Sequence, residues 1–206
     1  MRTLKMYGSA INRKFLDETV EALRDGGIII YPTDSLYALG CDALNNRAVE
    51  KICALKNIDP KKQHLAILCS DISQASRYAR LDNRAYDIIR RNAPGAFTFI
   101  LPASPALPKV FKGRREVGVR IPDDPIACAL AESLGNPLLT TTIELPDGID
   151  YDMADVATLE VAERYADRAE ILIDAGSRGL TGSTIVDLTD SSAPQIVRQG
   201  LATVDI

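Results

Sequence analysis

The sequence predicts an α/β fold in which a mixed parallel and antiparallel sheet is flanked by helices. Short apolar runs of strand length, such as residues 28–30 and 97–101, are interleaved with segments of helical periodicity, a pattern typical of α/β proteins. Residues that end or cap helices and strands stand at the junctions. The last apolar runs follow one another closely, which favours some antiparallel pairs.

The elements expected in the first half of the chain alternate in type. They are a helix at 13–25, a strand at 27–32, a helix from 46 to 55, a strand at 65–69 and two short helices that begin at 71 and 82. Gly26 stops the first helix, because glycine readily adopts the conformation found just past a helix end. Asn46, Asp71 and Asp82 offer side-chain oxygens that cap the N-termini of the other helices. Pro94 then forces a turn.

The second half continues the alternation. Its expected elements are strands at 97–101 and 117–121, a helix at 125–134, a strand at 137–142, a helix near 154–166 and strands at 170–174, 183–188 and 195–199. Pro125 suits the first turn of a helix and Gly135 suits its end. The 206 residues are enough for one sizeable core and too few for two domains of usual size. We therefore expect residues 1–206 to form a single domain.

Composition narrows the classes of protein. Hydrophobic residues at 46% and charged residues at 25% are ordinary for a globular protein. No apolar run approaches the ~20 residues of a membrane span, and the first ten residues lack the pattern of a secretory signal. We expect a soluble, cytoplasmic protein without a membrane partner. The net charge of -4 excludes a broadly basic surface for nucleic acid but allows a local basic cleft.

The cysteines and the single histidine predict neither a metal site nor a disulfide framework. The four cysteines are widely spaced and form no C-x-x-C pair: Cys41, Cys53, Cys69 and Cys128. We interpret them as small buried apolar side chains. His64 has no serine or cysteine at a spacing suggestive of a triad, so a surface or strand-edge position is favoured.

Two segments raise the question of phosphate binding. The glycine-rich run GSRGLTGST at 176–184 matches neither common nucleotide-binding fingerprint, and a plain loop is the favoured interpretation. A basic run holds Lys109, Lys112, Arg114 and Arg115, and a second basic group holds Lys56, Lys61 and Lys62. Each is either a solvated face or a surface that attracts phosphate.

Polar residues at the expected strand ends are more informative as a set than singly. They are Thr33, Ser35, Lys56, His64, Arg120, residues 140–142, Ser183, Thr184 and Arg198. If these ends converge, they line a cleft with hydroxyl donors and cations. Such a lining suits a phosphorylated or carboxylated small ligand, because cations neutralise its charge and hydroxyls fix its orientation.

The stretch YPTDSLYALGCDA at 31–43 resembles the hallmark segment of the YrdC/YciO family. Four later segments resemble family motifs in the same order: PGAFTFIL, VGVRIPDDP, STIVDL and VRQG. The likeness extends over nearly the whole chain. It implies the YrdC-like fold, a twisted mixed sheet flanked by helices with a large concave, electropositive cleft.

The resemblance also implies an activity. Synthases of this family join ATP, L-threonine and bicarbonate into L-threonylcarbamoyladenylate, with release of pyrophosphate, for the modification of tRNA. ATP is a substrate there, and Mg²⁺ accompanies it. Such a nucleotidyltransferase needs positioning and charge neutralisation and no covalent nucleophile, so no catalytic residue is assigned.

Matched position by position, the resemblance implies two groups of ligand-binding residues. Those implied for threonine are Thr33, Arg120, Thr142 and Ser183. Those implied for the nucleotide are Lys56, Thr140 and Arg198. Supporting candidates near the phosphates are His64, Lys61, Lys62 and Arg114.

Two departures from the synthase motifs leave other functions open. Ile58 stands where synthases carry the arginine of K-x-R, and Glu144 stands where they carry the asparagine of S-x-N. The first change removes a cation, and the second puts a carboxylate where phosphate would be repelled. Both are similar to the YciO branch. One alternative is a module of the same fold that binds RNA, including tRNA or double-stranded RNA, or a nucleotide without efficient turnover. Another is a cleft that now serves a partner protein.

Overall fold

The computed structural model describes residues 1–59, 63, 65–108, 111, 115–143, 165, 167–179 and 181–206. Within these residues the chain forms five helices and one ten-stranded sheet. Four neighbouring strand pairs are parallel and five are antiparallel. The predicted class, an α/β fold with a mixed sheet, is confirmed.

The elements have the following bounds. The strands are β1 (Arg2–Lys5), β2 (Ile29–Tyr31), β3 (Ala38–Asp42), β4 (Ala66–Leu68), β5 (Phe97–Pro102), β6 (Glu116–Arg120), β7 (Leu138–Thr142), β8 (Ile171–Asp174), β9 (Thr184–Asp187) and β10 (Gln195–Arg198). The helices are α1 (Arg13–Arg24), α2 (Asn46–Leu55), α3 (Ile72–Tyr78), α4 (Asn83–Asn92) and α5 (Pro125–Leu134). In the described part of the chain, none of these helices has the length and apolar character needed to cross a membrane.

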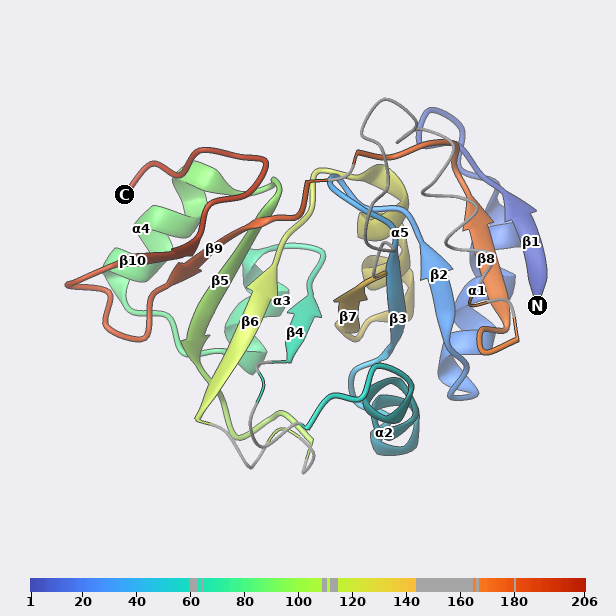
Figure 1. Cartoon of the computed structure of the whole chain (residues 1–206), viewed down its shortest axis with the longest axis horizontal. Helices are drawn as coiled ribbons and strands as arrows, with labels where there is room; N and C mark the ends of the chain where they lie inside the picture. The colour runs from blue at the N-terminus through green and yellow to red at the C-terminus, as the bar shows by residue number, and fades with distance from the viewer. Residues whose placement is uncertain are drawn as a thin grey trace.

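The strand order is β1-β8-β2-β3-β7-β4-β6-β5-β9-β10. Figure 1 shows the sheet twisting along this order, with β1 at one end and β10 at the other. Strands β3 and β7 run antiparallel near the middle of the sheet. The antiparallel pairing expected among the last strands is confirmed for β9 and β10.

Helices cover the sheet through two separate clusters of buried side chains. Helices α1 and α5 share one cluster with Ile29 and Tyr31 of β2. Helices α2, α3 and α4 share the other cluster with Ile30, the residue between them. Successive side chains of a strand point to opposite faces, which explains why neighbours in β2 belong to different clusters. Figure 1 shows α1 by β8 and β2, α5 by β3 and β7, α3 by β4 and β6, and α4 by β5 and β10.

Most predicted elements are observed, but one helix cap differs and two strands were not expected. Asn45, not Asn46, caps α2, because its side chain accepts the N–H of Ala48. Strands β1 and β3 were not predicted. Strand β1 has only four residues, and the glycine and aspartate in the sequence of β3, ALGCD, lower the strand propensity of that segment. The helix predicted near 154–166 lies outside the described residues, apart from residue 165.

Side-chain caps begin the helices. Asp71, Asp82 and Asp124 each accept a backbone N–H from the first turn of the helix that follows. Asp82 also accepts a hydrogen bond at 2.7 Å from the Ser191 hydroxyl, which ties the start of α4 to the segment between β9 and β10. These hydrogen bonds, led by the one from the Ala85 N–H, lower the pKa of Asp82.

We predict that Asp82→Ala lowers the free energy of unfolding by about 1 kcal/mol, because the first turn of α4 loses its cap. The pKa of Asp82 is lower in the folded chain, so its charge stabilises the fold at neutral pH, and this contribution is lost as the pH falls through the folded value. Asp82→Asn retains a capping oxygen but has no charge. The difference in the free energy of unfolding between the wild type and Asp82→Asn should therefore narrow on acidification. Urea unfolding at several pH values measures it, and a difference independent of pH would contradict the prediction.

Candidate functional site

Residues 31–43 form a hairpin, not a strand followed by a loop. Strands β2 and β3 pair in antiparallel fashion and are joined by residues 32–37. The Thr33 hydroxyl closes this turn: it donates to the Leu36 carbonyl oxygen at 2.7 Å and accepts the Ser35 N–H at 3.2 Å. Thr33 is fully buried. Its hydroxyl therefore fixes the shape of the turn.

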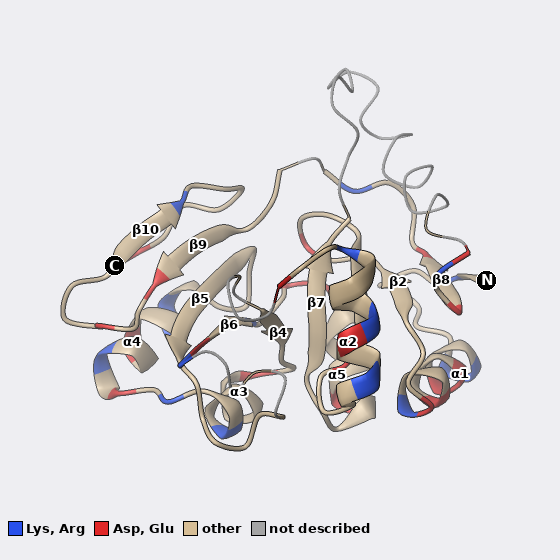
Figure 2. Cartoon of the chain, turned by 60° about the horizontal axis from the view of Figure 1, so that its bottom comes forward, with Lys and Arg blue, Asp and Glu red and all other residues tan. Residues whose placement is uncertain are grey.

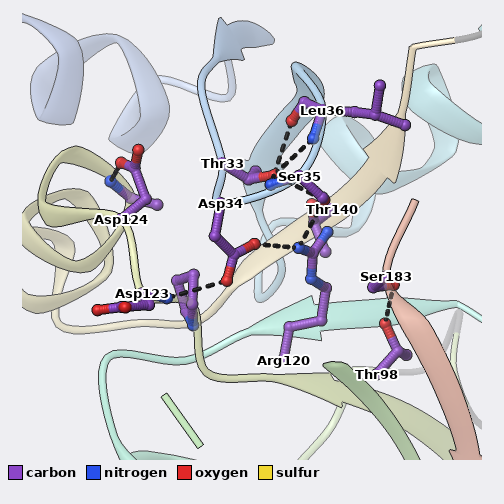
Figure 3. Close-up of polar contacts among 12 residues, drawn as sticks. Thr33, Asp34, Ser35, Leu36, Thr98, Arg120, Asp123, Asp124, Thr140 and Ser183 are labelled. Atoms are coloured by element: carbon purple, nitrogen blue, oxygen red, sulfur yellow. Dashed lines mark hydrogen bonds and ion pairs between the residues drawn. The ribbon is translucent and has the colours of Figure 1, made fainter. Parts of the chain in front are cut away.

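A buried ion pair joins this turn to β6. Nη2 of Arg120 donates to Oδ1 of Asp34 at 2.8 Å and to the Ser35 hydroxyl oxygen at 3.3 Å. The side chains of Arg120 and Asp34 are only 6% and 8% exposed. The second oxygen of Asp34 accepts the Asp123 N–H at 2.9 Å. Figure 3 shows Arg120 reaching from its strand toward this turn.

The guanidinium of Arg120 is not fully used by these contacts. Its Nε is buried and has no hydrogen-bond partner among the residues that the structure describes. A buried donor without a partner is costly, and such groups call for an explanation by function or by a bound molecule. Because Nε has almost no accessible surface, an acceptor oxygen of a ligand would reach it only after a small shift of the side chain.

A cleft of about 250 Å³ lies beside Arg120. Its lining comes from seven elements and their ends: Ile52, Ile58, Leu65, Ala66, Thr98, Ile100, Gly118, Arg120, residues 139–142, Ser183, Ile185, Val197 and Arg198. This volume is close to the lower end of the ~300–1,000 Å³ typical of small-molecule sites. Hydroxyls and two arginines form its polar part.

Small residues make room for the cleft on one face of the sheet. Ala66 of β4 pairs with Gly118 of β6, and Gly118 pairs with Ile100 of β5. A Cβ atom on Gly118 would lie 3.1 Å from the Ala66 Cβ and 3.2 Å from the Thr98 Cγ2. The alternate residues Phe99 and Val119 belong to the core cluster on the other face. The polar cleft and the apolar core thus share the same strands.

Ser183 is held from two sides. Its hydroxyl is hydrogen-bonded to the Thr98 hydroxyl at 2.9 Å, and both residues are buried. Its carbonyl oxygen accepts from Nε and Nη2 of Arg198, at 3.2 and 2.7 Å. Gly200 packs against this point, because a Cβ there would lie 2.4 Å from the Ser183 carbonyl carbon. These contacts hold the STIVDL and VRQG segments of the sequence against each other.

The sequence predicts that Thr140 lies at a strand end. In the structure it lies in the middle of β7. Its hydroxyl oxygen accepts a hydrogen bond from the Tyr31 hydroxyl at 2.8 Å. Thr140 is 6% exposed and Tyr31 is fully buried. Burial raises the pKa of Tyr31 well above its ordinary value. Tyr31 therefore remains a protonated donor across the physiological range.

The structure brings five of the predicted ligand-binding residues together. Those that line the cleft are Arg120, Thr140, Thr142, Ser183 and Arg198. Thr33 does not line the cleft. Its hydroxyl oxygen lies 3.2 Å from the Ser35 hydroxyl oxygen, which Arg120 also contacts. Lys56 is the C-cap that follows the last residue of α2, and it does not line the cleft, although Ile52 and Ile58 on either side of it do.

The remaining predicted candidates cannot be placed. His64, Lys61, Lys62 and Arg114 lie outside the described residues, and so does Glu144 of the departure from S-x-N. The four cysteines can be compared with their prediction. Cys41, Cys53 and Cys69 are buried, as predicted, and Cys128 is half-buried.

Three residues of the site were not assigned from the sequence: Asp34, Thr98 and Tyr31. Each acts through a residue that was assigned, namely Arg120, Ser183 and Thr140. A sequence signal existed for Thr98, which is the one polar side chain in the run FTFIL. No local pattern reveals the other two partners, which lie 86 and 109 residues away along the chain.

The charges of the lining favour an anionic ligand. Arg120 and Arg198 contribute to it, and no carboxylate does within the described residues. Figure 2 shows charged residues gathered on the helices and at strand ends, with few in the strand interiors. No cluster of three or more His, Cys, Asp and Glu suited to a metal occurs in the described part of the chain.

The chain is similar to proteins of one family over most of its length. The Sua5/YciO/YrdC family model, described as "Telomere recombination", matches residues 21–200. The uncharacterized protein YciO of Escherichia coli (strain K12) is 37% identical over 194 residues, which cover 93% of this chain and 92% of that protein. A threonylcarbamoyl-AMP synthase of Vibrio campbellii is 27% identical over 191 residues, or 91% of this chain and 100% of that protein.

Two solved structures are similar to the fold. The crystal structure of E. coli YciO has a TM-score of 0.86 at 33% identity and covers 98% of both chains. The crystal structure of P. abyssi Sua5 complexed with L-threonine has a TM-score of 0.84 at 27% identity. That match covers 97% of this chain and 58% of the Sua5 chain.

We predict that Asp34→Ala and Arg120→Met each lower the free energy of unfolding by about 3 kcal/mol, because each leaves a buried charge without its partner. The double variant should lose much less than the sum, since neither charge then remains. Urea unfolding of all four proteins gives the coupling energy. Arg91→Met, which removes an exposed pair with Asp205, is the control and should cost under about 1 kcal/mol. Additive losses for Asp34 and Arg120 would refute the prediction.

Proposed function

Since the chain belongs to the Sua5/YciO/YrdC family, which includes threonylcarbamoyl-AMP synthases, we propose that it makes L-threonylcarbamoyladenylate. Its substrates would be ATP, L-threonine and bicarbonate, and its product would serve tRNA modification in the cytoplasm. One observation supports this most: two arginines and several hydroxyls meet in a single cleft. On this proposal residues 1–206 act as one YrdC-like domain.

The amino acid would occupy the side of the cleft near Arg120. One nitrogen of that guanidinium is held by Asp34, and a small shift of the side chain would let Nε donate to a carboxylate. Charge-assisted hydrogen bonds of this kind are among the strongest in proteins. The hydroxyls of Ser183 and Thr142 line the same cleft and would orient the rest of the amino acid. The L-threonine in the Sua5 complex supports an amino-acid substrate.

The nucleotide would lie toward Thr140 and Arg198. In the described chain, Arg198 donates from Nε and Nη2 to the Ser183 carbonyl and from Nη2 also to the Ser183 hydroxyl, so Nη1 would face a phosphate. Lys56 ends α2 close to this side, between Ile52 and Ile58 of the lining. Mg²⁺ bound to ATP would neutralise part of the triphosphate charge.

The reaction needs alignment more than acid–base chemistry. Threonine and bicarbonate form a carbamate with release of water, and a carbamate oxygen attacks the α-phosphorus while the bond to pyrophosphate breaks. Arg120 would hold the carboxylate of the amino acid, and the hydroxyls would fix the remaining atoms. Holding two reactants in line removes much of the entropic barrier, so a fixed cleft supplies the main catalytic effect.

A second function is favoured by one observation. Ile58 lines the cleft and packs against the apolar core at the position where synthases carry an arginine. The cation missing there would weaken the grip on a triphosphate. The alternative is a module that binds RNA, tRNA included, or a nucleotide in the same cleft without efficient turnover.

We predict pyrophosphate release that requires L-threonine, bicarbonate and Mg²⁺-ATP together. Arg120→Lys should weaken threonine binding about ten- to a hundredfold, because a lysine cannot make the planar contact of a guanidinium. Titration calorimetry with L-threonine measures this, and Arg91→Lys, on an exposed helix surface, is the matched control with unchanged affinity. Absence of threonine-dependent pyrophosphate release, together with salt-sensitive binding of RNA, would favour the second function.

We further predict that Ile58→Arg combined with Glu144→Asn raises ATP affinity, because the pair restores a cation and removes a carboxylate at the implied phosphate positions. A gain of about tenfold corresponds to one added charge-assisted hydrogen bond. The affinity is measured by titration with Mg²⁺-ATP, and Ile58→Leu controls for altered packing. Unchanged ATP binding would count against the alignment with the synthase motifs.

A further inference from the structure

Tyr31 and Thr140 connect the buried core to the cleft. Tyr31 belongs to the core cluster that includes α1 and α5, whereas Thr140 lines the cleft. Their side-chain oxygens are 2.8 Å apart, with the Tyr31 hydroxyl as donor. The tyrosine is fully buried, so it cannot itself contact a ligand in the cleft. Its effect on a ligand must pass through Thr140.

Gly40 makes this contact possible. Strand β3 lies between β2 and β7, and Gly40 is directly opposite Thr140 in the ladder. Tyr31 is paired with Ala38, two residues before Gly40, so its ring must cross the strand diagonally over Gly40. A Cβ at Gly40 would lie 2.6 Å from Cε1 of Tyr31. The absence of a side chain at Gly40 therefore opens the path for the ring.

The direction of the hydrogen bond fixes what Thr140 can offer. A threonine hydroxyl has one hydrogen and two acceptor lone pairs. The Tyr31 hydroxyl occupies one lone pair, and this donation keeps the Thr140 hydrogen pointed away from Tyr31. Burial raises the pKa of Tyr31, so deprotonation does not reverse the arrangement near neutral pH.

We propose that Tyr31 is a positioning residue that orients the Thr140 hydroxyl as a donor into the cleft. The ligand atom at this point is then an acceptor oxygen, such as a phosphate oxygen, and not an N–H group. This inference rests on the proposed function, which places Thr140 against the nucleotide. It assigns to Tyr31 and Gly40 of the hallmark segment a role in recognition, reached through one intervening side chain.

The test is a double-mutant cycle with AMP as the probe. Tyr31→Phe keeps the ring and removes only the hydroxyl, and we expect AMP affinity to fall about three- to tenfold, the range of one hydrogen bond. Thr140→Val should cause a similar loss. In the Thr140→Val background, Tyr31→Phe should have no further effect, whereas in the Thr140→Ser background it should still weaken binding. Titration calorimetry measures all five variants and the wild type.

Controls separate positioning from general damage. Tyr78→Phe removes the hydroxyl of another buried tyrosine, on α3 and away from the cleft lining, and AMP affinity should be unchanged. In the free wild-type protein, NMR should detect a protected Tyr31 hydroxyl proton with an Overhauser effect to the Thr140 methyl group. Circular dichroism shows whether Tyr31→Phe remains folded. If it unfolds, AMP binding by Thr140→Ser with and without Tyr31→Phe is compared at lower temperature.

Three outcomes would overturn either this inference or the proposed function. Wild-type AMP binding that Tyr31→Phe leaves unchanged overturns the inference and leaves the proposed function standing. Equal losses from Tyr31→Phe in the wild-type and Thr140→Val backgrounds also overturn it, because the effect would then not pass through Thr140. Failure of the wild type to bind AMP or L-threonine removes the proposed function and the nucleotide role of Thr140 with it.

Discussion

The cleft depends on the ion pair between Asp34 and Arg120. In the sheet order, β7 and β4 lie between β3 and β6, so the pair joins parts of the chain that share no ladder. Asp34 also accepts the Asp123 N–H, which fixes the segment leading into α5. Two buried charges are costly to desolvate unless their geometry is good. Here the carboxylate is satisfied at both oxygens, and the turn between β2 and β3 is held beside Arg120.

Two other polar side chains of the cleft are supported in the same way, each by a buried partner. Thr98 supports Ser183, and Tyr31 supports Thr140. Buried hydroxyls with fixed partners lose little freedom when a ligand arrives, which lowers the entropic cost of binding. Small residues on the sheet face, such as Gly118, provide the space. The cleft is thus a prearranged polar surface built on strands whose opposite faces form the core.

The fold was largely predictable from the sequence, because periodicity and caps are local signals. Helix α5 was predicted with its observed bounds, since Pro125 and Gly135 mark its two ends. Strand β3 was missed because its pairing with β2 and β7 outweighs the weak propensity of a glycine-containing run. For the site, the resemblance supplied five residues that do line one cleft. Their partners could not be predicted, because the contacts join residues far apart in the chain.

The two halves of the cleft differ in how firmly they are built, and this bears on which function the chain performs. On the side proposed for the amino acid, Arg120 is held by Asp34 and keeps a buried nitrogen without a partner in the described structure. On the side proposed for the nucleotide, Arg198 directs two nitrogens at the Ser183 carbonyl, and Ile58 is apolar. If the proposed function holds, a carboxylate would meet a held guanidinium, whereas a triphosphate would depend on Mg²⁺ and on few protein cations. The choice between synthesis and binding without turnover would then be decided on the side of the cleft proposed for the nucleotide.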